Sequence, residues 1–214
     1  MLAAAVAGAA LVICGVSAAS RSPRLERLAL NAADMQTARA ALLRASDLAG
    51  VPPGWRPLET TPDDSAPPCP WQDYSRLTLS GRAQAGFQAA KVGASGYVGS
   101  TIDIYASRAQ AQAKFEIDTH AGTVSCEAEA LRKAFGSTLT TVAARQVAIR
   151  GVGERGTSFQ FVYSQTKEPR RIFVDVIELV RGRGVATVDM TNFDSSGSAA
   201  TRLALVHAVD GRLG

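Results

Sequence analysis

The stretch RIFVDVIELVRGRGVATVDMT, residues 171–191, decides the fold class of this chain. Residues 171–180 are apolar on both faces of an extended chain apart from Asp175 and Glu178, which predicts a central strand covered on both sides. Residues 184–191 predict the next strand, and the short connection RGRG (181–184) is typical of a hairpin. The stretch therefore predicts an antiparallel sheet with other elements packed against it.

The segments around this hairpin alternate between extended and helical patterns. Further strands are predicted at 96–105, 145–150 and 157–163, and residues 76–92 contain short extended pieces of ambiguous type. Helical patterns are found at 37–48, from Ser107 toward His120, near 124–135 and at 197–212. We therefore expect an α+β fold: an antiparallel β-sheet flanked by helices on both faces, as in an α/β/α sandwich.

The N-terminal residues 1–20, MLAAAVAGAALVICGVSAAS, form an uncharged apolar run that predicts a targeting segment and an N-terminal apolar helix. Small residues at 16–19 favour a cleaved signal peptide. Two alternatives stay open. About 20 apolar residues just span a bilayer, which would give a membrane anchor, and acylation of Cys14 would give a lipoprotein. We expect residues 21–36 to be a tether and 37–214 to be a single α+β domain, secreted or held at the cell envelope.

The three cysteines allow one internal pair. Cys14 falls in the targeting run, which leaves Cys69 and Cys126. An oxidising compartment makes a disulfide between these two the default, whereas a chain that is not exported would keep two free thiols. A zinc site would need further ligands at suitable spacing, which His120 and His207 do not supply. We therefore expect no metal and no other cofactor.

Basic residues are scattered along the chain. It contains 23 Lys and Arg against 19 Asp and Glu, a net charge of +4. Nucleic-acid-binding proteins gather their basic residues on one face, whereas here acidic residues sit among the basic ones. We expect no nucleic-acid partner, and only a weak attraction to anionic lipid or envelope polymer.

The glycine motif GVGERG (151–156) has the spacing of a dinucleotide fingerprint. That fingerprint needs a helix after it, because the pyrophosphate binds at the helix N-terminus. The segment that follows, 157–163, predicts a strand, so the motif indicates a turn between two strands. The sequence also lacks a nucleophile elbow, an HExxH motif and a P-loop, and we expect no catalytic residues.

Several titratable side chains are nevertheless candidates for acid–base chemistry. Glu178 and Asp189 are expected to be diagonal neighbours on one sheet face across the hairpin. If Asp175 is buried, it needs a partner such as an Arg, and we favour a structural ion pair there. His120 and His207 lie in helical stretches that look partly exposed.

Three residues are candidate ligand contacts. Trp55 and Trp71 flank the Pro-rich loop at 60–70 and would stack on a sugar or peptide, although packing in the core is the alternative for both. Asp175 is the third candidate.

Three motifs carry a resemblance to known proteins: ALLRASDLAGVPPGW (41–55), IDIYASRAQAQAKF (102–115) and VAIRGVGERGTSFQF (147–161). They are similar to segments of actinobacterial exported proteins of unknown function. As a set they also resemble the extracellular sensor domains of mycobacterial-type receptor serine/threonine kinases and, more loosely, the PsbP-like α/β/α sandwich. The resemblance implies a non-catalytic, sensor-like domain outside the membrane. These 214 residues contain no kinase domain, and they have one expected disulfide where those sensor domains usually have two.

The leading functional hypothesis is a secreted or envelope-associated binding module for a small molecule, a peptide or an envelope polymer. It predicts a concave surface near the sheet or under the Pro-rich loop. One alternative is an envelope hydrolase, which requires convergent Asp, Glu, His or Ser side chains. Another is a structural or interaction protein of the envelope, which requires an exposed apolar patch.

Overall fold

The computed structural model describes residues 25–49, 51, 54–60, 69–90, 96–134, 139–165, 170–193 and 197–214. The predicted signal peptide, its alternatives as an anchor or acylated segment, and the N-terminal apolar helix lie outside these residues. Residues 61–68 of the Pro-rich loop also lie outside them. Within the described ranges, no helix has the length and apolar character needed to span a membrane.

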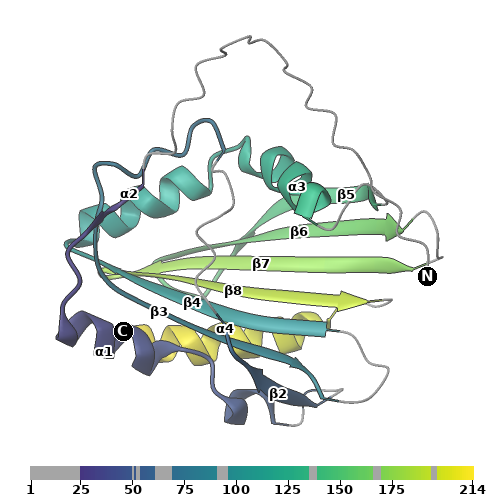
Figure 1. The fold of residues 1–214 in the computed structure, drawn as a ribbon, viewed down its shortest axis with the longest axis horizontal. Coiled ribbons are helices and arrows are strands. Elements are labelled where there is room, and N and C mark those ends of the chain that lie inside the picture. The colour runs from purple at the N-terminus through teal and green to yellow at the C-terminus, as the bar shows by residue number, and fades with distance from the viewer. Residues whose placement is uncertain are drawn as a thin grey trace, which may run out of the picture.

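One eight-stranded sheet forms the centre of the molecule, with strand order β1-β3-β4-β8-β7-β6-β5 and β2 added to β3 (Figure 1). Every pairing is antiparallel except the short β1–β3 pair. The strands are β1 (Arg27–Leu28), β2 (Trp55–Leu58), β3 (Thr78–Ala89), β4 (Gly96–Tyr105), β5 (Leu139–Ile149), β6 (Arg155–Gln165), β7 (Arg171–Arg181) and β8 (Gly184–Phe193).

The predicted hairpin at the centre of the sheet is confirmed. Strand β7 pairs with β8 in a register that joins Arg181 to Gly184, so Gly182 and Arg183 form the turn. Gly182 has φ +56°, a left-handed conformation that tight hairpin turns require and that glycine adopts without strain. The motif at 151–156 likewise connects β5 to β6, with Gly151 and Gly153 at positive φ, and it is a turn as expected.

Helices cover both faces of the sheet, which confirms the predicted α+β class (Figure 1). The helices α2 (Arg108–Asp118) and α3 (Thr123–Ala134) lie on one face, and α1 (Ala32–Ala41) and α4 (Ala199–Leu213) lie on the other. A short 3-10 helix, η1 (Ala45–Leu48), follows α1. The strand β1 and the first residues of α1 fall within the segment expected to be a tether.

Serine side chains cap the N-termini of α2 and α4. The Ser107 side chain accepts a hydrogen bond from the backbone N–H of Gln110 at the start of α2, and Ser198 accepts from Thr201 at the start of α4. Such caps satisfy backbone donors that have no partner inside the helix.

The two faces of the sheet are packed differently. Under α1 and α4 the core is continuous, with residues such as Ile177, Val188 and Val206 fully or almost fully buried. On the other face the apolar residues form two separate clusters, one under α2 around Phe115 and one under α3 around Phe161. Polar and charged side chains occupy the region between these two clusters, and the candidate site lies there.

Candidate binding cavity

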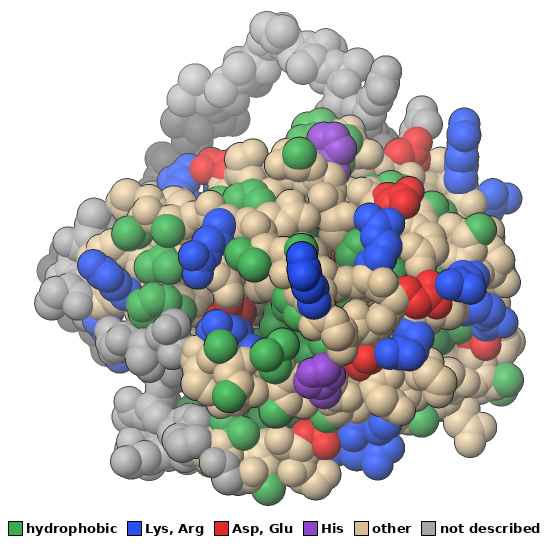
Figure 2. Space-filling view, turned by 180° about the vertical axis from the view of Figure 1, so that it is seen from behind, with side chains coloured by type: hydrophobic (Ala, Val, Ile, Leu, Met, Phe, Trp, Pro, Cys, Tyr) green, Lys and Arg blue, Asp and Glu red, His purple; other side chains and the backbone are tan. Residues whose placement is uncertain are grey.

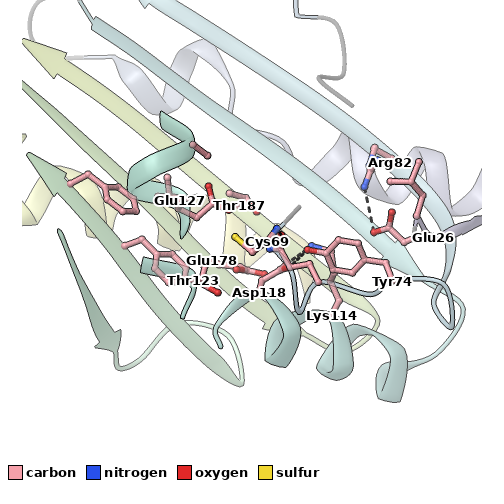
Figure 3. Close-up of a pocket in the computed structure, with 16 residues that line it drawn as sticks. Glu26, Cys69, Tyr74, Arg82, Lys114, Asp118, Thr123, Glu127, Glu178 and Thr187 are labelled. Carbon is pink, nitrogen blue, oxygen red and sulfur yellow. Dashed lines mark hydrogen bonds and ion pairs between the residues drawn. The ribbon is translucent and has the colours of Figure 1, made fainter. Parts of the chain in front are cut away.

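A cavity of about 320 Å³ lies between α2, α3 and the sheet (Figure 3). Aromatic and aliphatic side chains of β6 and β7 form part of its wall, namely Phe159, Phe161 and Val176. The polar lining comes from elements that are far apart in the sequence. These residues are Glu26, Gln72, Tyr74, Arg82, Lys114, Asp118, Thr123, Glu127, Glu178 and Thr187.

A buried ion pair on α2 forms one side of the cavity. Lys114 and Asp118 are one helical turn apart and are joined by a salt bridge, with side chains only 14% and 12% exposed. The Tyr74 hydroxyl donates to the other oxygen of Asp118 at 2.5 Å. The Lys114 ammonium also lies 4.8 Å from the centre of the Tyr74 ring, a favourable cation–π distance. Asp118 therefore has a partner at each oxygen.

Burial and the Asp118 carboxylate shift the pKa values of Lys114 and Tyr74. Burial opposes the charge of Lys114, but the neighbouring carboxylates, Asp118 first, keep the pKa of Lys114 above its usual value. Burial and the nearby Asp118 also raise the pKa of the Tyr74 hydroxyl. Lys114 is therefore charged and Tyr74 is a neutral donor across the physiological range.

Glu178 of β7 enters the cavity from the sheet beside Asp118 (Figure 3). It is 4% exposed, and burial, followed by repulsion from Asp118, raises the pKa of its carboxyl well above the usual value. Its Oε1 atom has no hydrogen-bond partner among the residues described. The same is true of the hydroxyl of Thr123, which begins α3 and is 3% exposed.

Glu127 extends the acidic character along α3. It lines the same cavity one helical turn beyond Thr123. Burial and then Asp118 raise the pKa of Glu127. Carboxyl groups thus line the cavity from both the sheet and the helix.

The cation at the edge of the cavity is already paired. Arg82 of β3 donates two hydrogen bonds to Asp103, at 2.6 and 3.0 Å. Glu26 lies 3.8 Å from the same guanidinium and accepts a hydrogen bond from the Tyr105 hydroxyl at 3.0 Å. Arg82 is therefore held by carboxylates and is poorly placed to bind an anionic ligand.

The expected disulfide is present and closes this side of the molecule. Cys69 and Cys126 are bonded, with their Cα atoms 5.9 Å apart. Cys69 lines the cavity and Cys126 lies on α3, so the bond ties the segment before β3 to that helix.

The three predicted ligand contacts are not brought together. Trp71 packs on His120, with ring centres 4.9 Å apart, and is not among the residues that line the cavity. Trp55 lies on β2 and packs against the core on the α1 and α4 face. Asp175 lies on that same face, 3.5 Å from Arg202, in the ion pair that we favoured from the sequence.

Asp175 lines a second hollow of about 320 Å³ with Arg145, Gln160 and Arg202. The polar groups there have partners: Arg145 donates to Gln160 at 2.7 Å, and Arg202 contacts Asp175. Nothing in this hollow matches the unpaired Glu178 and Thr123 oxygens, so the cavity under α2 and α3 is the stronger candidate.

The five titratable residues considered for a hydrolase do not meet at one site. Glu178 and Asp189 share one face as diagonal neighbours, because Glu178 pairs with Thr187 in the β7–β8 register. Asp175 points to the opposite face, and His120 and His207 are both exposed. The convergent set that this hypothesis requires is not formed by these five residues.

Of the main cavity residues, only Glu178 was a candidate from the sequence. Lys114, Asp118, Thr123 and Glu127 were not identified. One signal was available: Asp118 falls on the buried stripe of α2 with Ala111 and Phe115, where an apolar residue is expected. A carboxylate on an apolar stripe indicates a buried polar site.

Comparison with known proteins identifies structural neighbours only. No family model and no curated protein matches this chain. The extracellular domain of PknH from Mycobacterium tuberculosis is similar over 83% of this chain and 95% of its own, with TM-score 0.49 and 12% identity. LpqN, involved in cell envelope biogenesis of Mycobacterium tuberculosis, is similar over 75% of this chain and 78% of its own, with TM-score 0.31 and 10% identity. Structural neighbours of this chain therefore include an extracellular domain and an envelope protein, and neither assigns a function to it.

Proposed function

We propose that this chain is an extracytoplasmic, non-enzymatic binding module and that a small molecule binds in the cavity between α2, α3 and the sheet. The observation that carries the proposal is the Glu178 carboxyl, 4% exposed, whose Oε1 has no partner in the described part of the chain. An unpaired buried polar atom costs about 1–3 kcal/mol, which a ligand that pairs with it recovers. The cavity volume of about 320 Å³ fits a small molecule better than a folded partner.

The disulfide supports a place outside the cytoplasm. Disulfides persist in oxidising compartments and are rare where thiols are kept reduced. Together with the apolar run at 1–20, the Cys69–Cys126 bond favours export, with cleavage as the leading proposal and anchoring or acylation at Cys14 as alternatives. The intact mass of the protein from its native host, before and after reduction, distinguishes these outcomes.

A fragment screen by ligand-observed NMR tests the binding function. The cavity-filling variant Ala130→Leu places a larger side chain in the cavity from α3 and keeps a good helix former there. Ala204→Leu makes the same change at an exposed position of α4, on the opposite face of the sheet.

We expect fragments that bind the natural chain and Ala204→Leu to lose binding to Ala130→Leu, while circular dichroism shows all three folded. Fragments that bind Ala130→Leu equally well would overturn the proposed site.

A further inference from the structure

The chemistry of the cavity lining points to the class of ligand, an inference that rests on the proposed function. We infer that the cavity binds a small organic cation, a primary ammonium with a short apolar tail, and that Glu178 is its counter-ion and loses a proton when the cation binds.

The charges around the cavity are unequal. Four carboxyl groups line it, from Glu26, Asp118, Glu127 and Glu178, against the two cations of Arg82 and Lys114. Arg82 is held by Asp103, and Lys114 is held by Asp118. Among the described residues, Glu127 and Glu178 form no salt bridge with a cation, and the nearby Lys114 only partly offsets the rise in their pKa values. An anionic ligand would meet this excess of carboxyl groups, whereas a cation completes their pairing.

The unpaired acceptors match the donors of an ammonium group. A primary ammonium carries three N–H donors and no acceptor. Glu178 Oε1 and the Thr123 hydroxyl are buried oxygens without a hydrogen-bond partner in the described residues, and Glu127 lines the same cavity (Figure 3). The wall formed by Phe159, Phe161 and Val176 offers apolar and aromatic surface to a hydrocarbon tail.

A metal ion fits this lining less well. Among the described ranges, no three or more His, Cys, Asp or Glu side chains are grouped so as to hold a metal ion. The cavity is also far larger than a bare ion requires, and part of its wall is apolar. The cation that fits is therefore organic.

Binding of a cation changes the protonation of Glu178. Before a cation binds, burial and the nearby Asp118 raise the pKa of the Glu178 carboxyl well above its usual value, which favours the protonated form. A bound ammonium favours the carboxylate. The proton of the Glu178 carboxyl then passes to solvent, and an ion pair between carboxylate and ammonium replaces the neutral acid.

Three probes of equal chain length test the charge preference: hexylammonium, 1-hexanol and hexanoate. Each is titrated into the isotope-labelled full chain and followed by amide chemical shifts. We expect hexylammonium to perturb residues 123–127 and 176–178 and to bind about tenfold or more tightly than the other two. Equal or tighter binding of hexanol or hexanoate would overturn the inference, as would displacement of hexylammonium by Ca²⁺ or Mg²⁺.

Calorimetry in phosphate and in Tris tests the proton release, because the two buffers take up a proton with different enthalpies. We expect release of about one proton per hexylammonium bound at neutral pH. Glu178→Gln should abolish this release and weaken binding about tenfold. Thr123→Val should weaken binding but keep the release.

Asp175→Asn is the matched control, since Asp175 is a buried acid on the same strand that faces the opposite side of the sheet. It should leave both the affinity and the proton release unchanged. A Glu178→Gln protein that binds hexylammonium like the natural chain overturns the inference.

Different experimental results would contradict the proposed function and the proposed ligand class. If hexanol or hexanoate binds better than hexylammonium and Ala130→Leu blocks it, the cavity remains the binding site and the charge preference is wrong. If Ala130→Leu leaves hexylammonium binding intact, the cavity is not the site and both proposals are wrong.

Discussion

The fold places the Asp189 carboxyl in a position where burial disfavours its charged form. It lies on β8, on the face covered by α2 and α3, and burial raises its pKa to about 6 from the usual 3.8. The folded chain therefore binds a proton at Asp189 more tightly than the unfolded chain does. The free energy of unfolding accordingly falls as pH rises from about 4 to about 6, and this loss is complete above that window.

We predict that Asp189→Asn raises the free energy of unfolding at pH 7.5 by on the order of 1–2 kcal/mol, with little effect at pH 3.5. Urea unfolding at the two pH values measures both effects. Glu59→Gln removes the same charge at an exposed position and should change little at either pH. Equal shifts in the two variants would contradict a role for burial.

Two lysines allow the effect of burial on an ion pair to be measured. Lys114 pairs with Asp118, and Lys133 pairs with Glu129, each across one helical turn. The first pair is 14% and 12% exposed, and the second is 72% and 47% exposed.

We predict that Lys114→Met lowers the free energy of unfolding by about 3 kcal/mol, because it leaves Asp118 charged, buried and short of a partner. Lys133→Met should cost less than about 0.5 kcal/mol. Urea unfolding at neutral pH distinguishes the two, and similar costs would show that the Lys114 pair is solvated.

At the level of elements, one glycine sets how closely α1 approaches the sheet. Gly81 of β3 faces the backbone of α1, and a Cβ atom there would lie 2.5 Å from the carbonyl carbon and oxygen of Asp34. We predict that Gly81→Ala displaces α1 and lowers stability by roughly 1–3 kcal/mol.

Gly211 of α4 is the matched control, because a Cβ atom there would have no neighbour within 4 Å. Gly211→Ala should raise stability by up to about 0.8 kcal/mol through helix propensity. Thermal unfolding should therefore shift in opposite directions for the two variants. A shift in the same direction would contradict the close packing of α1.

The disulfide links two elements that the chain order separates. Cys69 and Cys126 are 57 residues apart, and closing a loop of that length is worth about 4 kcal/mol in the chain-entropy model. The double variant Cys69→Ala, Cys126→Ala should lose about this much stability in urea unfolding. The natural chain in reductant should unfold at the same urea concentration as the variant. If the variant had the same midpoint as the oxidised natural chain, the bond would contribute little to stability.

Over the whole molecule, the two helical layers should differ in local stability. Helix α4 packs on a continuous core, whereas α3 covers a cavity and is cross-linked to the chain by the disulfide. Fewer buried contacts lower the free energy of local opening.

We predict that amides of α3 exchange with deuterium faster than those of α4, and faster still after reduction. Hydrogen exchange with mass spectrometry measures both, and equal protection of the two helices would contradict the prediction.

Basic side chains are scattered over the face in Figure 2 with acidic ones between them, as the sequence suggested.

The local features were predictable because neighbouring residues decide them. The β7–β8 hairpin follows from a short glycine-containing turn between two apolar runs, and the turn at 151–156 follows from glycines before a strand. The pairing of Cys69 with Cys126 follows from counting the cysteines of a chain that is expected to be exported.

Strand β3 was predicted only as short extended pieces of ambiguous type within 76–92, because its sequence, TLSGRAQAGFQA, has few large apolar residues. Its pairing with β4 and its contact with α1 through Gly81 decide its conformation.

By itself, the sequence determined the fold class and the central hairpin, since both depend on composition and short-range pattern, and the cysteine count predicted the disulfide pair. Only the tertiary structure decided the cavity. It brings Lys114 and Asp118 of α2, Thr123 and Glu127 of α3 and Glu178 of β7 together, and it buries Asp118, Thr123 and Glu178. Burial and the mutual repulsion of carboxylates then raise the pKa of Glu178, and neither exists until the helices pack on the sheet.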